Sequence, residues 1–149
     1  MKKEQRKMNL AIYRKCDEIR QEVLIARNGK KVRKQDYPAA VVSCADSWGN
    51  SQNAIAETSG KVDSKSYEQT SDLEAALKTL GKIGSKRDEN VCKNYIGGCA
   101  EPHAARSVMK KNNTATVNGL VFSYAYRPRT KMVIRYCRNC TDVFNVQNP

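Results

Sequence analysis

Long apolar runs are absent from this 149-residue chain, and its mean hydropathy is −0.70. A transmembrane helix needs about 20 predominantly apolar residues, so we expect no membrane-spanning helix and no membrane partner. The basic residues 1–7 lead into an amphipathic stretch and not into the apolar region of a secretory signal. We therefore expect a soluble protein and no signal peptide in this chain.

Acidic residues are also scarce, with 15 Asp plus Glu against 27 Lys plus Arg, which gives a net charge of +12 and a pI of about 9.6. Such a field attracts polyanions, and nucleic acid is the usual partner of a basic domain. A basic surface without a specific partner is the alternative, because charge alone is a weak indicator. Internal repeats and low-complexity linkers are lacking as well, and the length fits a single domain.

Hydrophobic periodicity and turn residues predict a mixed α/β order of elements. The expected elements are a helix over 2–26, a β-hairpin of 37–45 and 53–59, a helix from Ser71, a polar loop over 85–98, a helix over 102–111, and strands over 120–126 and 132–136. Ser71 and Glu74 have the capping-box spacing, in which each side chain accepts a hydrogen bond from the other residue's amide.

Histidine is limited to a single residue, whereas there are six cysteines, two of them in the Cys-x-x-Cys pair Cys137 and Cys140. This pair indicates metal or redox chemistry. Cys99 stands at a predicted helix start, where the helix dipole favours a thiolate. Three such ligands are enough for a catalytic zinc ion (Zn²⁺), which leaves a fourth position to water. Glu101, two residues after Cys99, is placed to move protons beside that metal.

The segments Cys99-Ala100-Glu101 and Cys137-Arg138-Asn139-Cys140 together resemble the signature of the cytidine deaminase-like superfamily. They look most like YwqJ-like and related deaminase domains of bacterial polymorphic toxins. The resemblance implies an α/β fold, a three-layer α/β/α sandwich with a central mixed sheet preceded by an N-terminal helix. The chain is then one deaminase-like domain over 1–149, with the N-terminal helix and basic loop in 1–35 and the zinc-binding core in 36–149.

The same resemblance implies a zinc-dependent hydrolase that converts cytosine to uracil by attack of activated water on C4. Cys99, Cys137 and Cys140 would hold zinc, and Glu101 would be the catalytic proton carrier. The backbone amide of Ala100 would help to hold the base carbonyl.

Charge near the motif favours a nucleic-acid substrate over a free nucleoside. The basic residues close to it in sequence are Lys110, Lys111, Arg127, Arg129, Lys131, Arg135 and Arg138. Tyr124, Tyr126 and Tyr136 are interleaved with these cations, and the first two either stack on bases or fill the core of a strand. Trp48, in the first hairpin turn, is a further candidate for stacking. We therefore expect Ala100, Trp48, Tyr136 and Arg138 to contact the substrate.

Single-stranded DNA is the favoured substrate, because a target base must leave its stack to react. RNA, duplex DNA and adenine as the target base remain open. The resemblance to toxin domains further implies a delivered bacterial effector that acts in the cytoplasm of the target cell, and an acidic immunity protein as partner.

The main rival hypothesis uses His103, which stands four residues after Cys99. Together with Cys99, Cys137 and Cys140, His103 would complete a closed structural zinc site without an open position. The protein would then be a non-enzymatic, zinc-stabilised nucleic-acid-binding module, and Glu101 would have no chemical role.

Overall fold

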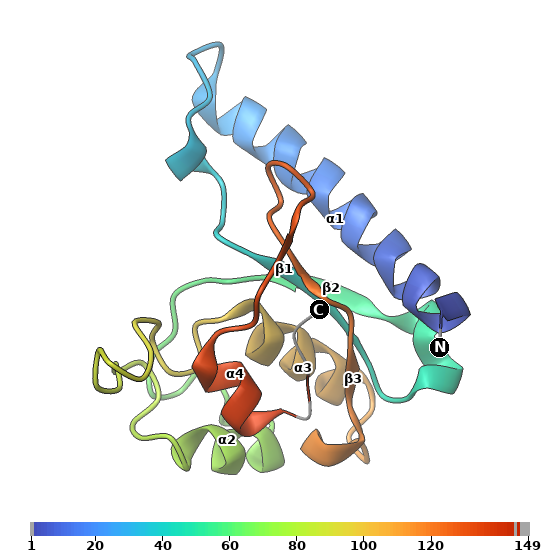
Figure 1. The fold of residues 1–149 in the computed structure, drawn as a ribbon, viewed down its shortest axis with the longest axis vertical. Helices are drawn as coiled ribbons and strands as arrows, with labels where there is room; N and C mark the ends of the chain where they lie inside the picture. Colours follow the sequence, from blue (N-terminus) through green and yellow to red (C-terminus); the bar gives the residue numbers. More distant parts are fainter. Residues whose placement is uncertain (1, 145, 147–149) are drawn as a thin grey trace.

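The computed structural model describes residues 2–144 and 146. Figure 1 shows a long N-terminal helix lying across a sheet, with the shorter helices on the other side. The helices are α1 (Lys2–Arg27), α2 (Ser71–Lys78), α3 (Ala100–Lys111) and α4 (Arg138–Val143), and the strands are β1 (Val41–Ala45), β2 (Ile55–Thr58), β3 (Val121–Phe122), β4 (Ala125–Tyr126) and β5 (Val133–Ile134). Three short 3-10 helices span Lys34–Asp36, Trp48–Asn53 and Val117–Gly119. Within the described residues, no helix has both the length and the apolar character that a membrane crossing requires.

The five strands form one sheet in the order β2-β1-β4-β5, with β3 also paired to β1. Every pairing among these strands is antiparallel. The expected mixed sheet is therefore wrong for the described strands. The physical reason lies in the connections, because β1 and β2 form a hairpin and β4 turns directly into β5, and short hairpin turns join antiparallel neighbours.

Helices cover both faces of this sheet. Successive side chains of β1 point to opposite faces, so each face has apolar residues for a helix to cover. Val41 packs with Ile12 and Cys16 of α1 in a small cluster. Val42 and Cys44 instead belong to the larger core that includes α3. The arrangement is helix on sheet on helix, with the N-terminal helix in one outer layer.

A β-bulge separates β3 from β4 and divides the strand predicted over 120–126. Phe122 pairs with Cys44 and Tyr126 with Val41, so four steps on one strand oppose three on the other. The extra residue turns Tyr126 toward α1, where its hydroxyl donates to Asn9 Oδ1 at 3.1 Å. Tyr126 is thus a core residue, whereas Tyr124 at the bulge is 38% exposed.

The predicted capping box is wrong, although α2 does begin at Ser71. The residue at the N-cap is Thr70, and its carbonyl already accepts the Glu74 amide at 2.9 Å. Ser71 therefore lies inside the first turn, and the Glu74 carboxylate pairs with Lys78 at 3.3 Å.

Candidate metal centre

Three cysteine thiols from two helix starts meet at one point. Cys99 is the N-cap of α3, Cys137 is the N-cap of α4, and Cys140 lies in the first turn of α4. All three Sγ atoms lie within 4.8 Å of one another. The Sγ atoms of Cys99 and Cys137 are 2.9 Å apart, and those of Cys137 and Cys140 are 3.5 Å apart. The pairing of distant segments that the sequence predicted is therefore present.

A glycine turn delivers Cys99 to this point. Gly97 adopts a positive φ of 86°, and a Cβ added there would lie 2.9 Å from the Tyr67 ring. The Tyr67 hydroxyl donates to the Gly97 carbonyl at 2.5 Å, and the Gly60 amide donates to the Gly98 carbonyl at 3.0 Å. Only glycine fits a left-handed residue packed this closely, so the Gly97-Gly98 turn fixes where α3 begins.

The loop 85–98, which leads into α3, holds α4 in place. Arg87 pairs with Asp142 at 2.8 Å and donates to Asn139 Oδ1 at 3.3 Å. The Asn139 side chain donates in turn to the Asn94 carbonyl at 3.1 Å. These contacts orient the short helix that carries Cys137 and Cys140, so the loop positions ligands even though it contributes none.

Glu101 lies beside the thiols and is almost completely buried, with 3% of its surface exposed. The Cys140 thiol donates to Glu101 Oε2 at 3.0 Å. Burial raises the pKa of Glu101 to about 7, and the hydrogen bond from Cys140 acts in the opposite direction. A carboxyl group with a pKa near neutrality is suited to accepting and returning a proton.

The three thiols do not ionise alike. Contacts with Cys140 and Cys99 hold the pKa of Cys137 well below its usual range. The hydrogen bond with Cys137 raises the pKa of Cys99, and burial raises the pKa of Cys140. The lowered pKa of Cys137 favours a thiolate, which is the form of cysteine that binds a metal cation.

The donor set suits zinc, since three soft thiolate ligands without a fourth from the described residues would leave one position open. Among the described residues, the cluster consists of Cys99, Cys137 and Cys140. His103 lies outside the cluster, with its Nε2 3.4 Å from the Gly60 carbonyl oxygen and its ring 6.1 Å from that of Tyr67. Burial lowers the pKa of His103. This placement does not favour the closed four-ligand site.

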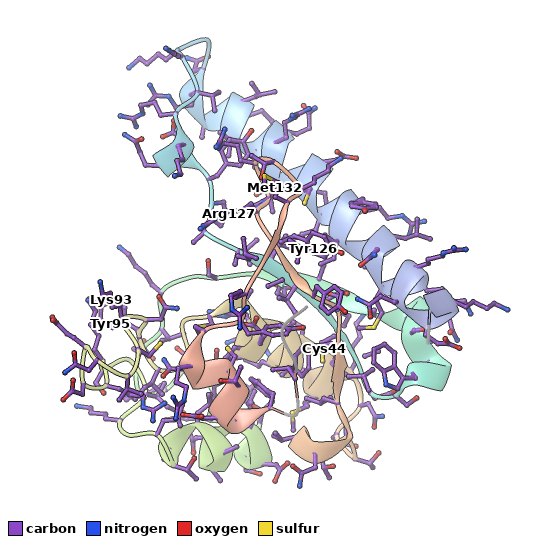
Figure 2. The ribbon with its side chains drawn as sticks, in the orientation of Figure 1. Cys44, Lys93, Tyr95, Tyr126, Arg127 and Met132 are labelled. Atoms are coloured by element: carbon purple, nitrogen blue, oxygen red, sulfur yellow. The ribbon has the colours of Figure 1, made fainter. Side chains whose placement is uncertain are left out.

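A cavity of about 500 Å³ opens beside the thiols. Cys99, Ala100, Glu101 and Cys137 all line it. Its cationic lining residues are Lys93, Arg127 and Arg135, and Asn94 and Tyr95 line it too. Figure 2 shows Lys93 and Tyr95 on the loop before α3 and Arg127 close to Tyr126 in the neighbouring hairpin. The cavity thus joins candidate metal ligands, a buried carboxyl group and positive charge.

Of the four residues expected to contact the substrate, one lines the cavity and three do not. Ala100 lines the cavity. Tyr136 is 8% exposed and its hydroxyl donates to the Ser123 carbonyl, so its ring supports the site from within the core. Arg138 is exposed but points to Asp142, 3.0 Å away, and does not line the cavity. Trp48 is half-buried in the 3-10 helix that contacts α1, and it does not line the cavity either.

Tyr95 is a candidate that the sequence analysis missed. It is 54% exposed on the cavity wall, and the Lys86 ammonium lies 4.8 Å from its ring centroid. The detectable indication was a single aromatic residue in the loop 85–98, four residues before Cys99.

Comparison of the chain with protein-family models, with curated proteins and with solved structures gives no match. Functional inference therefore depends on the site and on the motif resemblance.

Proposed function

We propose that this protein is a zinc-dependent deaminase that converts cytosine to uracil in nucleic acid, with single-stranded DNA as the favoured substrate. One observation carries the proposal: the buried Glu101 carboxyl group lies next to a three-thiol cluster and lines the same cavity. The resemblance of the two motif segments to deaminases supports the same chemistry.

Each residue of the site then has a stated task. Cys99, Cys137 and Cys140 hold the metal. When bound, zinc would act as a Lewis acid that makes water nucleophilic near neutral pH. The Glu101 carboxylate takes a proton from the attacking water and delivers it to N3 of the cytosine ring. It then takes the remaining hydroxyl proton of the C4 adduct and delivers it to the amino group, which leaves as ammonia while the C4 carbonyl of uracil forms. Its pKa near neutrality suits both directions of transfer.

The first turn of α3 supplies a further contact. The Ala100 amide is at the first helical position, where backbone N–H groups have no partner within the helix. Because Ala100 lines the cavity, this amide is placed to donate to O2 of the target base. Such a bond would orient the ring so that C4 faces the metal and N3 faces Glu101.

The cations at the cavity support a polymeric substrate. Lys93, Arg127 and Arg135 line the space next to Glu101, and phosphate groups on both sides of a target nucleotide would meet them. A single strand is the least costly form, because its bases need not leave a duplex.

The resemblance also supports a role as the toxin domain of a bacterial effector that acts in the cytoplasm of a target cell. The net charge of +12 suits an acidic immunity protein as its inhibitor.

Mass spectrometry of defined oligonucleotides tests the proposed reaction. The zinc-loaded protein is incubated with cytosine-containing single-stranded DNA, duplex DNA and RNA, with an adenine-only strand and with free nucleotides. A gain of about one dalton per converted base that is lost in Glu101→Gln supports the proposal, and the rates rank the substrates. If none of these substrates is converted while zinc remains bound, the proposed reaction is overturned.

A further inference from the structure

A second cavity, of about 450 Å³, adjoins the one beside the thiols. Ala39, Arg127 and Ile134 line both cavities, so the two spaces share a wall. The second cavity lies between the segment 34–39 and the hairpin 127–134. We call the two cavities together the Arg127 groove. It extends from the metal centre toward the tip of the β4–β5 hairpin, which Figure 1 shows projecting from the sheet beside α1.

Positive charge continues along the whole groove. Lys93, Arg127 and Arg135 line its first part, and Lys34, Arg127 and Arg129 line its second part. Among the described residues, Glu101 is the one acidic residue that lines either cavity. Within the described part of the chain, none of the five cations forms an ion pair.

Nearby carboxylates are engaged by cations outside the groove. Asp36 pairs with Arg33 at 2.9 Å, and this ion pair and its hydrogen bonds lower the pKa of Asp36 to about 2. Asp17 pairs with Lys131 at 3.4 Å. The charge facing the groove therefore remains positive, and an anion entering it meets no competing carboxylate from these two residues.

Arg127 has the geometry of a phosphate ligand. Its Nη1 donates to the Ala39 carbonyl at 3.1 Å, which fixes the guanidinium on the shared wall. The remaining N–H donors of an arginine fork match two phosphate oxygens. Met132, which is 65% exposed, and the half-buried Tyr37 give the second part of the groove an apolar surface next to these donors.

We propose that the Arg127 groove binds a single strand of nucleic acid, with the target base in the first part and neighbouring nucleotides in the second. The phosphate between them lies on Arg127, the next phosphates lie near Arg129 and Lys34, and the unstacked neighbouring bases pack on Tyr37 and Met132. A basic track combined with an aromatic or apolar platform is the usual physics of single-strand binding. This inference rests on the proposed function for the position of the target base, but strand binding itself requires no reaction.

Binding of labelled oligo-dT to the zinc-loaded protein tests the groove without turnover, because the probe contains no cytosine. Fluorescence anisotropy is measured with strands of 2, 5 and 15 nucleotides over a range of salt concentrations. Arg129→Gln and Lys34→Gln are the main variants, since neither side chain has a hydrogen bond or ion pair that would make it structural in the described residues. Lys110→Gln and Lys111→Gln remove the same charge at the far end of α3 and are the matched controls.

Each groove variant is expected to lower the salt slope of log K for the longer strands by about 0.7 per lost phosphate contact. The dinucleotide should show a smaller change, because it does not reach Arg129 or Lys34. The inference is overturned if the control variants reduce the slope as much as the groove variants, or if the wild-type affinity does not rise with strand length. An oligo-U arm separates RNA from DNA, and tighter binding of a duplex than of a single strand would also overturn the inference.

The groove and the proposed reaction fail in different ways. If the protein deaminates a substrate but the groove variants do not change the salt slope, the proposed reaction stands and the groove is rejected. Strand binding that depends on Arg129 and Lys34, without deamination of any substrate, would retain the groove and reject the reaction.

Discussion

The Cys140 thiol donates a hydrogen bond of 3.0 Å to Glu101 Oε2. This contact joins the Cys-x-x-Cys helix to the first turn of α3, two residues after Cys99. A proposed metal ligand and the proposed proton carrier are thus direct neighbours. Each can be altered by itself, because thiol and carboxyl group come from different helices.

Glu101→Gln is expected to lower kcat by about 10²–10⁴-fold, the usual contribution of a positioned acid–base group. The amide is isosteric with the carboxyl group, so bound zinc and thermal stability should change little. Rates are measured on the best oligonucleotide, with zinc content determined by elemental analysis. A variant that keeps more than a tenth of the wild-type rate would remove Glu101 from the mechanism.

Cys137→Ser is expected to lose zinc at micromolar protein, because Cys137 contacts both other thiols. His103→Ala should retain one zinc per chain, since its ring nitrogen faces the Gly60 carbonyl. Elemental analysis after gel filtration compares the two variants. Loss of zinc from His103→Ala would favour the closed structural site of the rival hypothesis.

Removal of the metal is expected to destabilise the fold. Zinc on Cys99 and Cys137 links residues 38 positions apart, and by the loop-entropy model for cross-links such closure stabilises by about 4 kcal/mol. Urea denaturation with and without a chelator measures the difference, under reducing conditions so that no disulfide forms. An unchanged midpoint would mean that the thiols are held together without the metal.

Asp142 is expected to make stability depend on pH at the acidic end. The hydrogen bond from Arg87, followed by the contact with Arg138, lowers the pKa of this carboxyl. A carboxylate with a lowered folded-state pKa stabilises fully above its unfolded pKa of about 3.9, and this stabilisation is lost as the pH falls through the folded value.

Wild type should therefore be more stable than Asp142→Asn from pH 5 to 8, and the difference should shrink below about pH 4. Thermal denaturation of both proteins across this range makes the comparison. A difference that persists at pH 2.5 would show that the charge of Asp142 is not its cause.

Tyr95→Ala is expected to raise KM for oligonucleotides about tenfold or more with little change in kcat, because stacking of a base on an aromatic ring contributes about 1–3 kcal/mol. Tyr95→Phe should behave like wild type, since the face of the ring and not the hydroxyl makes the contact. Steady-state kinetics on one strand compares the three proteins. Equal effects of the two substitutions would assign the role to the hydroxyl group.

Local sequence patterns were sufficient to predict several of these helices and strands. The helix α1 was predicted from apolar residues that recur every three or four positions. These residues are Met8, Ile12, Cys16, Ile19 and Val23, and all five are buried in the structure. The β1–β2 hairpin also follows from local apolar runs. The convergence of Cys99 with Cys137 and Cys140 was predicted from ligand chemistry and from the resemblance, and not from periodicity.

Other features depend on tertiary contacts that no local pattern encodes. The bulge between Phe122 and Tyr126 arises from pairing with β1, so it is invisible within the strand itself. Tyr136 was expected at the end of a strand over 132–136, but β5 ends at Ile134. The Tyr136 hydroxyl donates to the Ser123 carbonyl, which removes Tyr136 from the exposed stacking residues. Tyr95 reaches the cavity because the loop 85–98 folds back, with Lys86 bridged to Tyr95.

Strand β5 has only two residues and lies at the edge of the sheet, next to exposed Met132. An edge strand this short offers few free backbone groups for pairing with another molecule, and flanking positive charges also repel such a neighbour. Arg129, Lys131 and Arg135 surround β5 in the sequence. The same charges that would favour a polyanion therefore also protect this edge against self-association.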